Sequence, residues 1–331
     1  MDILVTGASG FVGAYLVRKL KRQDHEVTCL VRKTSNISEL TQAGVKFAYG
    51  DILNETSLNE AVANKDVIYH LVGRGSLSAN SEKDFQEFYN VNVGGTKNLL
   101  NAIHNNNPHI KKIIYTSSTA AVGLLKGVVN ETTVSNAQSP YQRSKRASEE
   151  LVLSYHKEHG LPVTIIRPSM VYGPRGVHSE ILRMCHFIKK GFFPLFNDGN
   201  NFVPLVHVED LVDGLVLASE KGRNGSIYFI LNDETTTMNQ LIDAISLAMG
   251  ITPFKVHIPK GFAKTCAFLL ENLASALKFR PIITSERIDS MTENRVFSVE
   301  KAKKELGFEQ RIRMADGIRK TVEWYRENNY I

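Results

Sequence analysis

The sequence has few cysteines, no long apolar run and no recognisable leader segment. Its three cysteines, Cys29, Cys185 and Cys266, lie far apart among the 331 residues. Their spacing forms neither a zinc-binding motif nor a CxxC redox motif, so we predict no metal site and interpret them as reduced thiols. The first residues, Met-Asp-Ile-Leu-Val-Thr-Gly, lack the basic region and the cleavage site of a signal peptide. We therefore expect a cytoplasmic protein.

The sequence also lacks a block of one charge. Forty Lys and Arg residues stand against 34 Asp and Glu, which gives a net charge of +6, and the basic residues are scattered. This distribution fits a small anionic ligand such as a dinucleotide better than nucleic acid, and we predict no nucleic-acid partner. The most apolar stretch, 262–279, is interrupted by charged and polar residues and is too short for a membrane span. We interpret it as a buried amphipathic helix.

The first half of the chain alternates between two periodicities. Short apolar runs predict strands at 2–6, 26–31, 46–49, 67–72, 112–117 and 163–166. Helical spacing occupies 11–21, 57–63, 85–105 and 141–160 between them. Apolar strands that alternate with helices predict an α/β fold with a doubly wound parallel sheet.

Beyond residue 168 the pattern loosens, and we predict two interleaved parts. Residues 1–174 and 204–235 would form the nucleotide-binding core, and residues 175–203 and 236–331 a smaller, mostly helical substrate-binding lobe. A ligand site is then expected between the two parts, beyond the carboxyl ends of the strands.

A glycine-rich turn follows the first strand directly. Gly7, Gly10 and Gly13 are spaced as GxxGxxG between that strand and the next helix. Glycine allows the tight turn and a close approach of the main chain to a pyrophosphate, and the helix N-terminus offers free N–H groups to the phosphates. This context predicts a dinucleotide site.

The end of the second strand carries cations and no carboxylate. A carboxylate there would favour the free 2′-hydroxyl of NAD, whereas Arg32 suits the 2′-phosphate of NADP. We therefore favour NADP and leave NAD open. Asp51 follows the third strand, where it either contacts the adenine or caps the next turn.

Tyr141 and Lys145 lie four residues apart at the start of a predicted helix and therefore share one face. A nearby ammonium and an oxidised nicotinamide both favour the phenolate form of a tyrosine, which makes Tyr141 a credible acid/base. A hydroxyl from Ser117 or Ser118, at the end of the fifth strand, would hold the substrate oxygen in line.

At this point the chain resembles the extended short-chain dehydrogenase/reductases, also called the NAD-dependent epimerase/dehydratase family. The resemblance covers nearly the whole chain. It rests on TGASGFVG at 6–13, GD at 50–51, HLVG at 70–73, NVGGT at 92–96, YTSSTAAVG at 115–123, YQRSK at 141–145, RPSMVYGP at 167–174, HVED at 207–210 and KAKKELGF at 301–308.

The resemblance implies a Rossmann-type core and a set of residue roles. Ser118, Tyr141 and Lys145 would be catalytic. His207 invites a catalytic role as well, but we interpret it as a structural residue near the junction of the two parts. The implied NAD(P) contacts are Gly7, Gly10, Phe11, Val12, Gly13, Arg32, Asp51, Ile52, Leu71, Val72, Gly73, Asn92, Thr116, Tyr141, Lys145, Pro168, Ser169 and Val171. Many members of the family dimerise through helices matching 84–104 and 141–158, so we expect a homodimer.

The substrate is less clear. Many sugar-nucleotide epimerases carry a diphosphate-binding arginine where this chain has Val203, and Arg287, Arg175 or Arg183 would have to replace it. We expect substrate contacts from Arg74, Ser117, Ser118, Thr119, Arg175, Asn201, Val203 and Arg287.

Three functions follow from these features. A nucleotide-sugar epimerase of the UDP-sugar 4-epimerase type, or a dehydratase, ranks first because these activities are the most common in the family. An NADPH-dependent reductase or dehydrogenase of the dihydroflavonol reductase or 3β-hydroxysteroid dehydrogenase type is favoured by Arg32 and Val203. A non-catalytic dinucleotide sensor ranks last, because a sensor need not keep Ser118, Tyr141 and Lys145.

Overall fold

The computed structural model describes residues 1–75, 82–277, 279, 281 and 283–331. Within these residues, the main sheet has seven parallel strands in the order β11-β7-β5-β4-β1-β2-β3. The strands are β1 (Asp2–Thr6), β2 (Glu26–Val31), β3 (Lys46–Tyr49), β4 (Val67–His70), β5 (Lys112–Thr116), β7 (Val163–Pro168) and β11 (Ser226–Ile230). The predicted doubly wound α/β fold is confirmed, with the ends of β4, β5 and β7 shifted by one or two residues from the predicted ranges.

Helices cover both faces of this sheet because the side chains of each strand alternate between them. Ile3 and Val5 of β1 pack toward one face, whereas Leu4 between them packs toward the other. The first face is covered by α1 (Phe11–Arg22), α2 (Ser38–Gln42), α8 (Val208–Lys221) and α12 (Glu300–Leu306), and the second by α3 (Asn59–Val62), α5 (Gly95–Asn106) and α6 (Pro140–His159).

The predicted long helix at 85–105 is divided in two. Helix α4 (Glu82–Tyr89) is followed by one turn of π-helix at Asn90–Gly94, and α5 begins at Gly95. Asn92 lies in that wider turn, and its side chain bonds to residues outside the helix. Such a bulge in a helix often marks a functional site.

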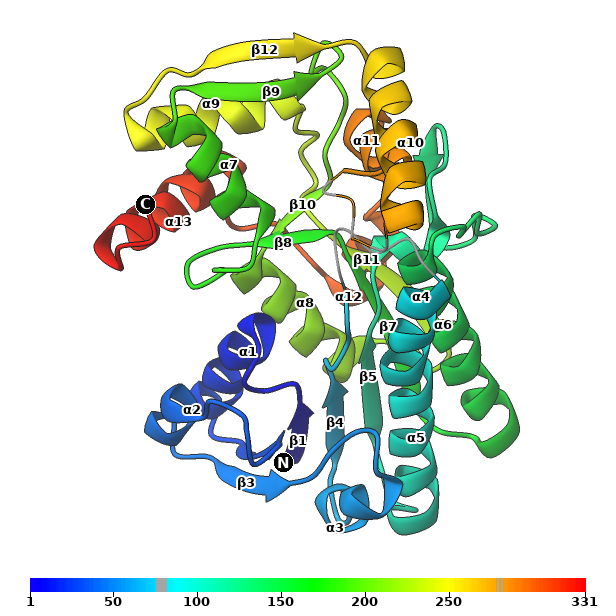
Figure 1. Cartoon of the computed structure of the whole chain (residues 1–331). Helices are drawn as coiled ribbons and strands as arrows, with labels where there is room; N and C mark the ends of the chain where they lie inside the picture. The colour runs from blue at the N-terminus through cyan, green and yellow to red at the C-terminus, as the bar shows by residue number, and fades with distance from the viewer. Residues whose placement is uncertain (76–81, 278, 280, 282) are drawn as a thin grey trace.

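The lobe lies above the carboxyl ends of the strands in Figure 1. Its apolar core comes from α7 (Glu180–Lys189), β9 (Phe192–Phe196), α9 (Met238–Met249) and α13 (Met314–Glu327). The lobe is mostly helical, as predicted, but β12 (Phe254–Ile258), which pairs with β9, was not predicted. Two short parallel pairs complete the strands described: β8 (Met170–Tyr172) with β10 (Leu205–His207), and β6 (Val128–Val129) with β13 (Val296–Phe297).

The C-terminal segment returns from the lobe to the core. Helix α11 (Ser285–Thr292) lies in the lobe beside α10 (Lys260–Leu277). Phe297, Ala302, Leu306 and Phe308 then pack into the apolar cluster on the α8 face of the sheet. The stretch 296–308, which the sequence assigned to the lobe, thus covers part of the core. The predicted boundaries at 174, 203 and 235 stay a prediction.

The prediction that 262–279 forms a buried helix is wrong. Helix α10 buries its small residues Ala263, Ala267 and Ala274. Five of its large apolar residues are more than half exposed: Phe262, Phe268, Leu269, Leu273 and Leu277. Helical spacing alone does not show which face turns inward. Among the described residues, no helix is both long and apolar enough to cross a membrane.

Candidate active site

The first turn of α6 positions the predicted acid/base pair. Ser139 caps the helix: its hydroxyl accepts the backbone N–H of Gln142, and the Gln142 side chain bonds back to the cap. Pro140 follows at the first helical position, where its missing N–H costs nothing. Tyr141 and Lys145 are therefore fixed one helical turn apart at the rigid beginning of a long helix.

Lys145 is buried with its ammonium at the carboxyl end of β5. Its Nζ donates to the carbonyl oxygen of Thr116 at 2.9 Å and lies 3.4 Å from the hydroxyl oxygen of Tyr115. Burial lowers the pKa of Lys145, whereas the nearby Tyr141 and Glu149 oppose that shift. The side chain is held beside Tyr141 as the predicted role requires.

Tyr141, Ser118 and Thr119 line one cavity of about 380 Å³. Ser118 caps a short 3₁₀ turn, and its oxygen accepts the N–H of Ala120 at 3.1 Å, which leaves the hydroxyl proton free to be donated. Ser117 lies next to it but is buried, and its hydroxyl has no partner among the described residues. The structure thus places Ser118 rather than Ser117 on the cavity wall.

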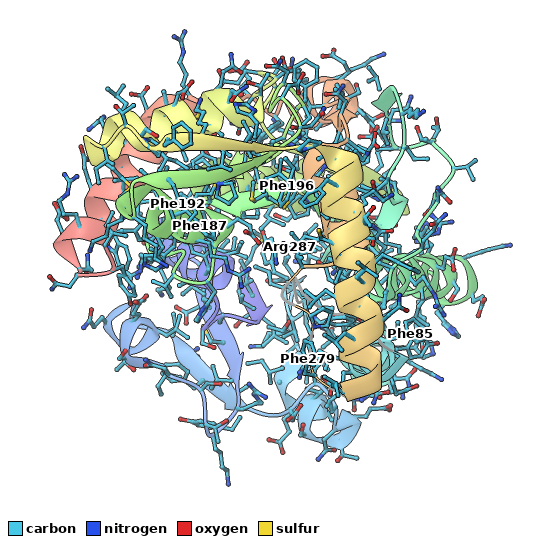
Figure 2. The ribbon with its side chains drawn as sticks, turned by 45° about the horizontal axis from the view of Figure 1, so that its top comes forward. Phe85, Phe187, Phe192, Phe196, Phe279 and Arg287 are labelled. Atoms are coloured by element: carbon cyan, nitrogen blue, oxygen red, sulfur yellow. The ribbon has the colours of Figure 1, made fainter. Side chains whose placement is uncertain are left out.

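The rest of this wall combines apolar side chains with charged ones and with five neutral polar residues, Ser139, Gln142, Ser169, Thr284 and Ser290. The apolar part includes Leu124, Met170, Met184, Val203, Met238, Met291 and Phe297. The charged side chains are Glu180, Glu286, Arg287 and Arg295. Figure 2 labels Arg287 between Phe196 of β9 and Phe279, which follows α10.

A second cavity, of about 500 Å³, lies over the glycine-rich turn. Ser9, Gly10 and Phe11 line it on one side, and Val171 and the segment 175–179 on the other. Gly7 has a φ of 73°, and a Cβ on Gly13 would lie 2.2 Å from the carbonyl oxygen of Gly7. Only glycine permits this turn, which brings the start of α1 against the end of β1.

The residues present fit a dinucleotide. Helix α1 begins after Gly10 with no side-chain cap and no acidic residue in its first turn, so its first N–H groups are available to phosphate oxygens. Farther along the site, the hydroxyls of Thr116 and Ser169 are buried without a partner among the described residues. These are polar groups of the kind that a bound cofactor satisfies.

The segment after β7 touches both cavities. Pro168 ends the strand, Ser169 and Met170 line the cavity with Tyr141, and Val171 lines the cavity over the glycine turn. Two cavities that share one strand in this way suit a dinucleotide and a substrate lying end to end.

Asn92 organises the junction between β4 and α6. Its amide oxygen accepts the N–H of Arg74 at 2.7 Å, while its Nδ2 donates to the Arg74 carbonyl oxygen and to the Ser144 hydroxyl, both at 3.0 Å. A Cβ on Gly73 would lie 3.7 Å from Lys145 Nζ. Asn92 therefore holds the backbone after Leu71 and Val72 close to α6 and to Lys145.

The other predicted cofactor residues lie after β2, after β3 and beside the glycine-rich turn. Arg32 is exposed after β2, and its guanidinium has no partner among the described residues. An oxygen of Asp51 accepts the N–H of Leu53 at 2.9 Å, which is a turn-capping bond. Ile52 is buried against Gly95 of α5, and Val12 is partly buried beside the turn.

Besides Ser117, three of the predicted substrate residues lie outside the cavity that contains Tyr141. Arg74 pairs with Glu87 at 2.8 Å. Arg175 lines the other cavity, where it pairs with Glu39. The Asn201 side chain donates to the carbonyl oxygen of Met291 at 2.9 Å and so supports a residue of the cavity wall from outside the cavity. Val203 and Arg287 do line the cavity, as expected.

The sequence reasoning missed Arg295, Glu180 and Glu286. These residues come from α7 and from the segment 284–297, far along the chain from Tyr141. They carry no motif, and only the packing of the lobe brings them to the wall. His207, interpreted as structural, is buried against the ring of Tyr172 and caps α8.

Comparison with known proteins gives relatives of full length. The chain is 29% identical to sterol demethylase protein B of Methylococcus capsulatus, with both chains fully covered. It is 26% identical to a 2-alkyl-3-oxoalkanoate reductase of Stenotrophomonas maltophilia, over 97% of this chain and 98% of that one.

Solved structures are also similar to this chain over nearly its whole length. The crystal structure of gox2253 superposes with a TM-score of 0.86 at 29% identity, over 100% of this chain and 99% of that chain. A dTDP-glucose 4,6-dehydratase of Streptomyces venezuelae, solved with NAD bound, gives 0.79 at 26% identity, over 99% and 98%.

The match to a family model is the most direct result. Residues 3–231, which include the glycine turn, Ser118, Tyr141 and Lys145, match the NAD dependent epimerase/dehydratase family. Its members among the structural neighbours are enzymes that bind NAD. This chain is a member of the NAD-dependent epimerase/dehydratase family, the extended short-chain dehydrogenase/reductases.

Proposed function

We propose that the chain is an NAD(P)-dependent dehydrogenase or reductase that acts on a secondary alcohol or ketone attached to an apolar body. The observation that carries this proposal is the wall of the substrate cavity. Its surface is largely methionine and other apolar side chains, and Val203 stands where many sugar-nucleotide epimerases place a diphosphate-binding arginine. Charge-assisted hydrogen bonds contribute about 1.5–3 kcal/mol each, and Val203 can make none.

The chain's own residues perform the proton chemistry in this proposal. Tyr141 takes the proton of the substrate hydroxyl in the oxidative direction and returns it in the reductive one. Ser118 donates a hydrogen bond to the same oxygen and holds it in line. The buried ammonium of Lys145 stabilises the phenolate that forms.

The dinucleotide would be held by the turn that contains Gly7, Gly10 and Gly13, by the start of α1, and by the hydroxyls of Thr116 and Ser169. When bound, it accepts or supplies the hydride of the reaction. The apolar wall excludes water from the reacting carbon, which strengthens the electrostatic interactions around it.

The test is turnover of apolar secondary alcohols and ketones with NAD(H) and NADP(H), followed at the absorbance of the reduced nicotinamide. Tyr141→Phe should lower kcat by ~10²–10⁴, because the proton transfer loses its acid/base. Tyr89→Phe, which alters an exposed tyrosine on α4, is the matched control. Unchanged turnover in Tyr141→Phe would contradict the mechanism.

A nucleotide-sugar epimerase or dehydratase is the second candidate, and Arg287 in the cavity favours it. Native mass spectrometry separates the two. An epimerase that returns hydride to the same carbon retains NAD through purification, whereas a reductase is purified with an empty site that fills with added dinucleotide. Stabilisation by UDP- or dTDP-sugars, together with retained NAD, would replace the first proposal by the second.

A further inference from the structure

Arg295 is a charged side chain of the substrate cavity for which the chain supplies no partner. It lines the cavity with Tyr141 and Ser118. Its Nε is fully buried and has no hydrogen bond among the described residues, and no carboxylate of those residues lies within ion-pair distance of its guanidinium. Burial lowers the pKa of Arg295 to about 10, so the group stays charged at neutral pH.

The carboxylates on the same wall are already engaged. Glu180 meets the Arg287 guanidinium at 3.3 Å through both oxygens, and Arg183 approaches it from outside the cavity at 3.6 Å. Glu286 accepts a hydrogen bond from the Gln142 amide at 3.3 Å. Arg295 therefore has no contacting carboxylate among the described residues, whereas Glu286 is held by a neutral amide and burial raises its pKa.

An unpaired buried charge destabilises a protein, and such groups are usually paired or bound to a ligand. Functional sites often contain residues that lower the stability of the folded protein. The remainder of the wall includes four methionines (Met170, Met184, Met238 and Met291), together with Leu124 and Phe297. The complementary ligand is an amphipathic anion with one charged group and an apolar body.

We propose that the substrate is a hydroxy or oxo carboxylic acid whose carboxylate pairs with Arg295 while its hydroxyl or carbonyl oxygen lies at Tyr141 and Ser118. This inference rests on the proposed function and names its substrate class. A planar guanidinium binds the two oxygens of a carboxylate side by side, which also fixes the orientation of the acid. The same pairing discriminates against neutral alcohols of equal size, because they leave the buried cation unpaired.

The experiment measures binding, so that it does not depend on turnover. Racemic 3-hydroxybutanoate, 3-hydroxyhexanoate and 3-hydroxydecanoate, each with its methyl ester, are titrated by calorimetry into the full chain saturated with NADH or NADPH. Alcohol and dinucleotide are then both reduced, so no hydride transfer accompanies binding. The 3-position is chosen because the relative from Stenotrophomonas maltophilia is named for a 3-oxo acid. Each ester keeps the hydroxyl and the apolar body and lacks only the charge.

For at least one chain length, the wild type should bind the acid about ten- to hundredfold more tightly than its ester, the ratio that charge-assisted hydrogen bonds support. Arg295→Gln should remove this preference without weakening the ester, and Arg295→Lys should restore part of it. Arg319→Gln, which alters an exposed arginine on α13, should behave as wild type. Because it removes a partly buried charge that no described carboxylate contacts, Arg295→Gln should also keep or raise the Tm of the ligand-free protein.

Acids that bind no more tightly than their esters, or that do not bind at all, would overturn the inference, as would a preference that survives in Arg295→Gln. Turnover measurements distinguish failure of the carboxylate inference from failure of the proposed function. Oxidation of neutral apolar alcohols with no preference for acids would leave the dehydrogenase in place and remove the carboxylate subsite. Tight binding of acids without oxidation of any alcohol would keep the subsite and remove the dehydrogenase.

Discussion

Arg32 is the residue on which we base a choice between two cofactors. It is exposed at the end of β2, two residues beyond Leu30, which lies opposite Thr6 before the glycine turn. A carboxylate at this edge would accept the ribose hydroxyls of NAD, whereas a guanidinium attracts the extra phosphate of NADP. We therefore infer a preference for NADP from this position.

Arg32→Asp should reverse that preference. We expect the ratio of kcat/KM for NADP to that for NAD to fall by about ten- to hundredfold, because a charge-assisted contact is replaced by repulsion. The neighbouring exposed Lys33, changed to Asp, is the control for a general loss of positive charge. A ratio that stays at the wild-type value in Arg32→Asp would remove the assignment of this residue to the ribose.

At the scale of elements, the contact between α6 and β7 positions the proposed catalytic residues. Arg167 of β7 donates to Glu149 of α6 through two parallel hydrogen bonds, of 2.9 and 2.7 Å, and both side chains are fully buried. The Arg167 guanidinium also lies over the ring of Phe229. This ion pair fixes the helix that carries Tyr141 and Lys145 to β7, the strand between β11 and β5.

Glu149→Gln should lower the free energy of unfolding by about 3–5 kcal/mol, since it leaves a buried guanidinium without its counter-charge. Combining it with Arg167→Met should recover part of that loss. The exposed pair Arg146–Glu150 on the same helix gives the control, and Glu150→Gln should cost no more than about 0.5 kcal/mol. Urea unfolding measures all three, and equal losses in Glu149→Gln and Glu150→Gln would contradict this role.

The secondary-structure elements also show which residues of the candidate site could be predicted from the sequence. Ser118, Tyr141, Lys145 and the glycine turn were predictable because each acts through short-range spacing next to a periodic strand or helix. Arg295 was not, because its place depends on how a segment more than a hundred residues later packs across the core. The outward orientation of the large residues of α10 was equally hidden, since periodicity defines a helix but not the direction of its faces.

At the scale of the whole molecule, two buried histidines make the fold sensitive to acid. His70 lies in the central strand β4 between the hydroxyls of Thr6 and Thr96, at 2.8 and 3.0 Å. Burial, followed by the charge of Lys145, lowers the pKa of His70 to about 3. Burial, with a smaller contribution from Lys320, lowers the pKa of His207 to about 4.

A depressed histidine pKa means that the unfolded chain binds protons that the native protein does not. Stability is therefore fully present above about pH 6.5 and falls as the pH drops toward the native pKa values. Each histidine should contribute a slope of about 1.4 kcal/mol per pH unit between roughly pH 6 and pH 4. Urea unfolding at several pH values should show a shallower slope for His70→Gln and an unchanged slope for the exposed His109→Gln; identical slopes in all three proteins would refute this origin.

The return of α12 to the core has a consequence for biosynthesis. The ribosome releases the N-terminal segments first, and all seven strands of the main sheet have been made once residue 230 has emerged. The apolar surface that Phe297, Ala302, Leu306 and Phe308 will cover stays open to water until the last part of the chain follows. A nascent chain that already contains every glycine of the glycine-rich turn is thus still incompletely folded. Premature termination within the lobe would release an aggregation-prone product rather than a smaller active protein.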